Sequence, residues 1–102
     1  MTTGGVNLVA GFRPSLWAHV APEEMAAGVT DFEQEVRGVD GYTMPATQHD
    51  LWVWVAGHAY HKVFDVTREA IQVLAPVARL ATEVAGWTYK ESRDLTGFID
   101  GT

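Results

Sequence analysis

The chain opens with a short run in which apolar residues recur at every second position. This run extends from Val6 to Phe12, and Pro14 follows it closely. A period of two is typical of a β-strand with one buried face, because successive side chains point to opposite sides. The pattern therefore predicts a half-buried strand that ends before Pro14. Its apolar side consists of Val6, Leu8, Ala10 and Phe12.

The most apolar stretch is Leu51 to Ala56, with the sequence Leu-Trp-Val-Trp-Val-Ala. Both sides of this strand are apolar, so we expect an interior strand that is covered on both faces. After Gly57 and His58, the period changes to that of one amphipathic helix from Ala59 to Ala75. The predicted helix ends near Ala75, because Pro76 inside it would lose a backbone hydrogen bond and clash with the preceding turn.

The stretch from Val77 to Tyr89 admits two interpretations, because Gly86 can end a helix or interrupt a strand. We favour a strand. Leu80, Thr82 and Val84 alternate, and the Trp87-Thr88-Tyr89 run is rich in residues that strands prefer.

The segment from Ala21 to Asp50 is rich in acids and shows no sustained apolar period. It predicts a long surface excursion with one short helical turn begun by Pro22. Its acids are interpreted as a solvated face. Connections of this length are uncommon in compact domains, so the excursion is either functional or contains an unrecognised element. The predicted order is strand, excursion, strand, helix, strand and terminal loop, which makes the fold class α+β.

Composition narrows the functional classes. The chain has 102 residues and a net charge of -6, from 13 acidic and 7 basic side chains. Nucleic acids and anionic membranes need clustered cations, so neither is expected as a partner. The absence of cysteine excludes disulfides and thiolate metal sites. The start lacks the pattern of a signal peptide, and no apolar run approaches the ~20 residues of a membrane helix. We therefore expect a soluble, cytoplasmic chain.

The last ten residues, Arg93 to Thr102, combine two glycines with a carboxylate: Arg-Asp-Leu-Thr-Gly-Phe-Ile-Asp-Gly-Thr. Such a loop can present Asp100 to a ligand. A plain Asp-Gly turn that ends a strand would have the same local sequence, so local chemistry alone leaves both interpretations open.

With its flanking residues, this ending resembles the dye-decolorising (DyP-type) haem peroxidases, in particular their shorter bacterial branch. Residues 97–102, Gly-Phe-Ile-Asp-Gly-Thr, match the Gly-x-x-Asp-Gly motif of that family, and Arg93-Asp94-Leu95 precede them as usual. The resemblance extends to Gly11-Phe12 with Leu16-Trp17, and to the run from Pro45 to Leu51. It covers nearly the whole chain.

The resemblance implies a ferredoxin-like antiparallel sheet with helix packing, in the dimeric α+β barrel superfamily. Residues 1–102 would form one partial domain, the N-terminal one of a peroxidase that reduces hydrogen peroxide while oxidising dye-like or phenolic donors. The implied cofactor is haem b. By resemblance, Asp100 is the distal acid-base residue. The loop residues facing the cofactor are Phe98, Ile99, Asp100, Gly101 and Thr102. A homo-oligomer and an encapsulating shell protein are further partners that the resemblance suggests.

The sequence departs from the family pattern at both ends. The iron-ligating histidine and the distal arginine of the family lie downstream of the Asp motif, so we assign no metal ligand in this chain. Only five residues precede Val6, where the family has a strand and a helix. In the sheet order 4-1-3-2 that strand pairs centrally, so its loss exposes strand edges. We therefore expect a fragment or truncated product, inactive alone and completed by missing segments or a second chain.

Several residues have a simpler interpretation beside the functional one. His58 and His61 are three apart, but no carboxylate stands at a matching spacing, so a surface role is favoured over metal binding. His49 and Asp50 are adjacent in the sequence and could suggest a catalytic pair, but adjacent side chains on a strand face opposite ways, so this pair is not favoured. Four aromatic residues are interpreted as packing rather than as a path for electrons: Trp52, Trp54, Trp87 and Tyr89. Arg93 is interpreted as locally paired. The alternative function is a non-catalytic ferredoxin-like module for assembly or ligand binding.

Overall fold

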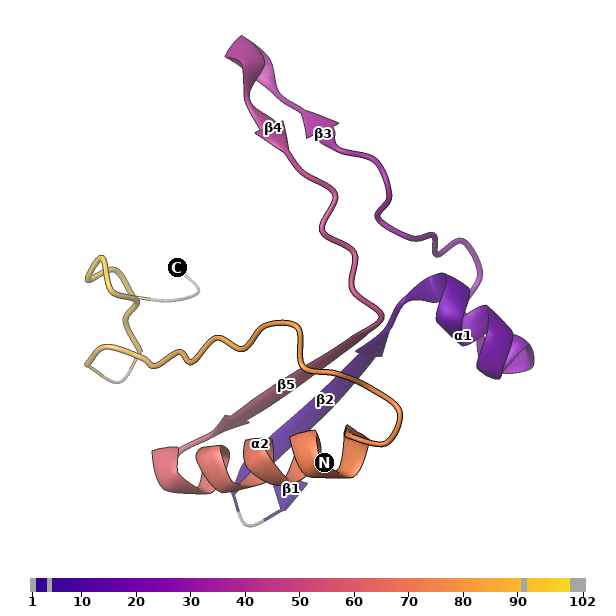
Figure 1. The fold of residues 1–102 in the computed structure, drawn as a ribbon. Coiled ribbons are helices and arrows are strands. Elements are labelled where there is room, and N and C mark those ends of the chain that lie inside the picture. Colours follow the sequence, from indigo (N-terminus) through magenta and orange to yellow (C-terminus); the bar gives the residue numbers. More distant parts are fainter. Residues whose placement is uncertain (1, 4, 91, 100–102) are drawn as a thin grey trace. The chain divides into compact units, whose positions relative to one another are not determined.

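The computed structural model describes residues 2–3, 5–90 and 92–99, and its longest strand pairing joins β2 (Val6–Phe12) to β5 (Leu51–Gly57) (Figure 1). The two strands are antiparallel, with Val6 opposite Gly57 and Phe12 opposite Leu51. Both strands lie where the sequence predicts them, β2 from its period of two and β5 from its apolar run. β5 continues one residue further, to Gly57.

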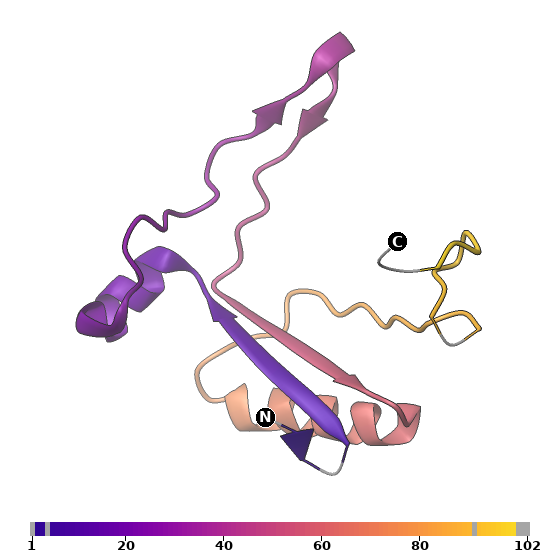
Figure 2. The ribbon, with the colours of Figure 1, turned by 180° about the vertical axis from the view of Figure 1, so that it is seen from behind.

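A two-residue strand, β1 (Thr2–Thr3), pairs with the start of β2, which gives the sheet order β1-β2-β5 (Figure 2). Among the described residues, β5 therefore has a neighbouring strand on one side only. The expected interior position of β5 is wrong for this part of the chain, because no described strand lies on its other side. The face of β5 that carries Trp52 and Trp54 is also open, since these side chains are 56% and 57% exposed.

The chain between β2 and the excursion contains a helix that the sequence pattern did not predict. α1 (Pro14–Val20) follows β2 directly, and Pro14 occupies its first turn, where a missing N–H costs nothing. Pro14 thus starts a helix as well as ending a strand. The helical turn predicted at Pro22 is confirmed as the 3-10 helix η1 (Pro22–Glu24).

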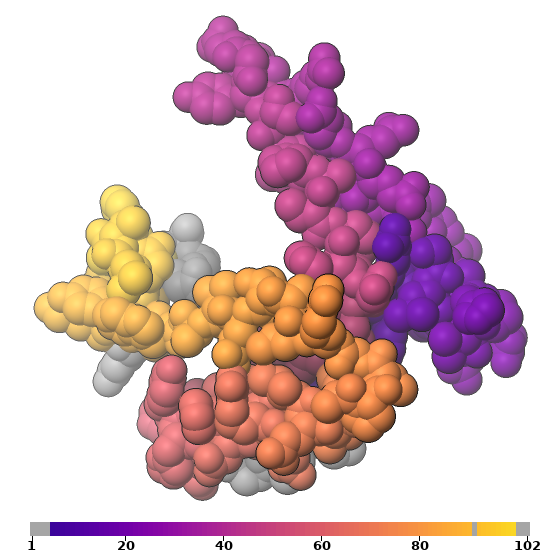
Figure 3. Space-filling model, viewed as in Figure 1, coloured from indigo at the N-terminus to yellow at the C-terminus, as the bar shows by residue number. Residues whose placement is uncertain are grey.

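Further along the excursion, β3 (Val36–Arg37) and β4 (Thr43–Met44) form a separate antiparallel sheet. Between them lies η2 (Val39–Gly41). We call residues 36–44 the arm. In the space-filling view the arm is narrow, with side chains projecting from it (Figure 3). Its apolar side chains are exposed: Val36, Val39, Tyr42 and Met44.

Ion pairs of Arg13 connect the excursion to the end of the β2–β5 ladder. Its guanidinium contacts the carboxylates of Asp31 at 2.8 Å and of Glu33 and Asp50 at 3.3 Å each. The other oxygen of Asp31 accepts the backbone N–H of Ser15 at 2.9 Å. Asp31 therefore stabilises the start of α1 and is only 9% exposed, so the expectation of a fully solvated acidic face is wrong at this residue.

The predicted helix is confirmed as α2 (Tyr60–Leu74), which ends before Pro76. Its first turns contact the sheet at Gly57, where an added Cβ would lie 3.1 Å from Val63 Cγ2 and 2.9 Å from the backbone oxygen of Gly5. Val6, 4% exposed, is the one buried hydrophobic residue among those described. Val6 belongs to the apolar side predicted for β2, but Leu8 and Phe12 on the same side are 42% and 51% exposed, so the expected half-buried side is covered only at Val6 among the described residues.

The strand predicted from Val77 to Tyr89 is absent. Residues 78–88 have no regular secondary structure, and Val77, Val84 and Trp87 are 84%, 88% and 66% exposed. Alternation alone does not make a strand, because its N–H and C=O groups need a neighbouring strand, and none of the described strands pairs with this segment.

The chain divides into two compact units, residues 1–69 and 70–102. The α+β class is confirmed, and two helices with small antiparallel sheets are compatible with a ferredoxin-like fold. In the described ranges, no helix is long and apolar enough to span a membrane.

Candidate functional site

The terminal loop is a small hairpin in the second unit. Arg93 stands opposite both Tyr89 and Ile99 in single antiparallel bridges. Asp94 N–H donates to Phe98 O at 3.1 Å, and Gly97 N–H donates to Asp94 O at 3.0 Å. Gly97 has φ +93°, a conformation that glycine adopts without steric cost. This pattern is typical of a three-residue hairpin loop that closes with glycine at a bulge.

Side chains hold the two sides of this hairpin together. The Asp94 carboxylate accepts hydrogen bonds from the hydroxyl and the backbone N–H of Thr96, and these bonds lower the pKa of Asp94 below its usual value. Arg93 Nη1 donates to Gly97 O at 2.7 Å. The expectation that Arg93 is paired locally is therefore confirmed, with the loop carbonyl as its partner.

Sequence reasoning did not assign Asp94 this role. The pattern Asp-x-Thr-Gly contains the signal, because an aspartate that accepts a hydrogen bond two residues ahead is common in turns that end at glycine.

Two of the predicted cofactor-facing residues lie on the returning side of the hairpin. Phe98 and Ile99 are 73% and 47% exposed, and Leu95 at the tip is 67% exposed. Asp100, Gly101 and Thr102 lie outside the described residues. The described part of the loop therefore presents exposed apolar side chains.

The four histidines do not come together. His19, His49, His58 and His61 are all exposed. Within residues 2–3, 5–90 and 92–99, no three His, Cys, Asp or Glu side chains are grouped so that they could hold a metal ion. The sequence-based decision to assign no metal ligand stays a prediction.

The tryptophans of β5 lie on one face, with ring centroids 5.7 Å apart and planes tilted by 45°. Trp87, in the second unit, is also largely exposed, and Tyr89 is 37% exposed. The expectation that these side chains are buried by packing is therefore not met among the described residues.

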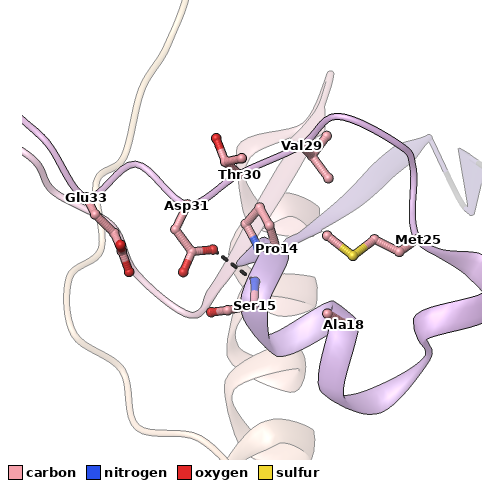
Figure 4. Close-up of a pocket in the computed structure, with 8 residues that line it drawn as sticks. All are labelled: Pro14, Ser15, Ala18, Met25, Val29, Thr30, Asp31 and Glu33. Carbon is pink, nitrogen blue, oxygen red and sulfur yellow. Dashed lines mark hydrogen bonds between the residues drawn. The ribbon is translucent and has the colours of Figure 1, made fainter.

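A shallow depression of about 310 Å³ lies beside α1 (Figure 4). Asp31 points from the excursion toward Ser15 across it, as the dashed bond shows. Because both Asp31 and Glu33 also bind Arg13, the two carboxylates of the depression already have a partner. Its lining is Pro14, Ser15, Ala18, Met25, Val29, Thr30, Asp31 and Glu33.

The fold and the loop define an α+β chain that ends in an ordered, apolar hairpin followed by a carboxylate. The chain is 30% identical over 97 residues, 95% of its length, to a dye-decolorizing peroxidase of Brevibacterium linens. It is 31% identical over 99 residues, 97% of its length, to one of Rhodococcus erythropolis. A third, from Mycolicibacterium paratuberculosis, is 33% identical over 61 residues, 60% of this chain and 17% of the relative.

The resemblance inferred from the sequence is confirmed: the chain is related to the dye-decolorizing peroxidases. It spans 26% and 28% of the length of the first two relatives, which is about a quarter of each. No family model matches the chain, and no solved structure gives a significant match.

Proposed function

We propose that these 102 residues are part of a haem-dependent peroxidase and contribute one side of its cofactor site. The observation that carries the proposal is the similarity to dye-decolorizing peroxidases along 95% of the chain. The ordered terminal hairpin supports it, because the motif residues that the structure describes form a defined loop. The proposal includes the partial ferredoxin-like domain, the cytoplasmic location, and hydrogen peroxide with an organic electron donor as substrates.

The described part of the loop fits a porphyrin chemically. Phe98 and Ile99 are exposed and apolar, and they would contact the ring of haem b, together with Gly101 and Thr102 beyond the described residues. When bound, haem iron supplies the oxidising equivalents, while the protein provides orientation and proton transfer. The hairpin bonds at Asp94 and Gly97 would keep Phe98 and Ile99 in place for this contact.

The role proposed for Asp100 is proton transfer. Its carboxylate would accept a proton from one oxygen of hydrogen peroxide and return it to the oxygen that leaves as water. A carboxylate suits this role under acidic conditions, since its reference pKa of ~3.9 keeps it ionised where a histidine is already protonated. Ile99, the residue before Asp100 in the sequence, bridges to Arg93 in the hairpin.

The test is to express these residues with their flanking coding sequence, to the length of the relatives, and to titrate the protein with haem. We expect a Soret band and oxidation of a dye by hydrogen peroxide. Phe98→Glu should weaken haem binding, because it places a charge against the ring. Phe64→Glu is the control, since Phe64 is 51% exposed on α2, outside the loop. An extended chain that folds but binds no haem contradicts the proposal and favours the non-catalytic module.

A further inference from the structure

The side-chain hydrogen bonds of the terminal hairpin connect different parts of it. The bonds of the Asp94 carboxylate go to Thr96, two residues ahead, so they organise the tip alone. The bond of Arg93 spans the tip, because its Nη1 donates to the carbonyl oxygen of Gly97 at 2.7 Å, four residues ahead. This one bond therefore connects the outgoing side of the hairpin to the returning side.

The backbone of Arg93 is itself held by neighbouring segments. Its N–H donates to Tyr89 O at 2.9 Å, and its carbonyl accepts the N–H of Tyr89 at 2.8 Å. Across the hairpin, Arg93 stands opposite Ile99 in an antiparallel bridge. The guanidinium therefore reaches Gly97 from a backbone position that other hydrogen bonds already hold.

The surroundings of the bond between Arg93 and Gly97 favour its strength. A bulge takes its residue out of the strand ladder, and the guanidinium supplies a donor to the carbonyl of that residue. Within residues 92–99, Arg93 and Gly97 are half-buried and the other side chains are exposed. A hydrogen bond from a charged donor is shorter and stronger than one between neutral groups, and partial burial strengthens it further. The bond is therefore suited to holding the returning side of the hairpin in place.

We propose that Arg93 is a positioning residue for the reaction with peroxide, because its bond to Gly97 O holds the returning side of the hairpin, which leads into Asp100. The returning side consists of Phe98 and Ile99. This role rests on the function proposed above. A displacement of about 1 Å in a reacting group can slow a reaction by ~10²-fold. Removal of the bond should therefore slow the reaction without removing the candidate acid-base residue.

Two substitutions isolate the donor, and both are made in the chain extended to the relatives' length. Arg93→Met keeps an unbranched stem without a donor, whereas Arg93→Lys keeps a cationic donor for the Gly97 carbonyl. Stopped-flow absorbance of the haem-loaded protein measures the reaction with hydrogen peroxide. We expect Arg93→Met to react about 10–10²-fold more slowly than the unaltered protein, and Arg93→Lys to stay within about threefold of it. Arg79→Ala is the control for loss of a cation in the same unit, since Arg79 is exposed, and its rate should not change.

Hydrogen exchange of the extended chain without haem is the second measurement, because it reports on the hairpin independently of activity. Asp94 N–H donates to Phe98 O, and Gly97 N–H donates to Asp94 O. Mass spectrometry follows the peptide that contains both amides. Arg93→Met should speed their exchange by about tenfold, as expected for the loss of a hydrogen bond from a charged group. Arg93→Lys should restore the exchange rate of the unaltered chain.

The outcomes separate the role of Arg93 from the proposed function. If Asp100→Asn reacts slowly and Arg93→Met reacts at the unaltered rate, the positioning role is overturned and the peroxidase function stands. Equal slowing in Arg93→Met and Arg93→Lys also overturns the role, because the donor is then not the cause. Unchanged hydrogen exchange in Arg93→Met does the same. If the unaltered extended chain binds no haem, both the role and the proposed function are overturned.

Discussion

Gly57 is a position where the structure predicts that a substitution lowers stability. A methyl group there would lie 2.9 Å from the backbone oxygen of Gly5, 3.1 Å from Val63 Cγ2 and 3.3 Å from Val6 Cγ2. The oxygen belongs to the main chain, so it cannot move without shifting the start of β2. Gly57→Ala must therefore separate β2 from β5 locally, or push α2 away from the sheet.

The expected size of this effect follows from two opposing contributions. Overpacking of a well-fitted contact costs about 1–3 kcal/mol. Replacing glycine by alanine lowers the entropy of the unfolded chain and stabilises by about 0.4–1 kcal/mol where the backbone permits it. The net expectation is a loss of about 1–2 kcal/mol in the free energy of unfolding.

Gly11→Ala is the matched control, because it lies in the same ladder, opposite Trp52. Its added Cβ would meet Trp52 at 3.5 Å, an ordinary contact, so we expect unchanged or slightly raised stability. Urea unfolding at one protein concentration, followed by tryptophan fluorescence, measures both variants. If Gly57→Ala is as stable as Gly11→Ala, the described contact between β5, Gly5 and α2 is wrong.

Two further predictions concern hydrogen-bonded carboxylates. Arg13 first, and then Ser15, lower the pKa of Asp31 from 3.8 to about 2, so this group stabilises the fold above pH ~4 and loses that contribution as the pH falls toward 2. Asp31→Asn should flatten acid unfolding in this window, whereas Glu33→Gln, at a 65% exposed side chain, should leave it unchanged. In the terminal hairpin, Asp94→Ala should accelerate amide exchange at Thr96 by removing its acceptor, as measured by NMR; unchanged exchange at Thr96 would show that the hairpin does not form.

The elements that could be predicted are those with a sustained period. Alternation located β2, the continuous apolar run located β5, and the helical period with Pro76 located α2. Each of these segments has at least seven residues, so the pattern repeats often enough to be recognised. The strands of the arm have two residues each, too few for any period.

The remaining differences arise from contacts between residues distant in sequence. Asp31 accepts a hydrogen bond from Arg13, which is eighteen positions away, and no spacing in the sequence indicates that pair. Residues 78–88 have the composition of a strand but no described partner, and pairing decides the outcome. For the candidate site, the sequence motif identified the loop, while the role of Asp94 and the bulge at Gly97 became clear only from the hydrogen bonds.

The proposal that the terminal loop belongs to a haem peroxidase is tested most directly by Asp100→Asn in the chain extended to the relatives' length. Asp65→Asn, on the exposed side of α2, is the isosteric control. Stopped-flow absorbance of the haem-loaded protein measures the rate of its reaction with hydrogen peroxide. Loss of the proton acceptor should slow this reaction by about 10²–10⁴-fold in Asp100→Asn and leave Asp65→Asn unchanged. Equal rates in both variants and in the unaltered protein would contradict the role assigned to Asp100.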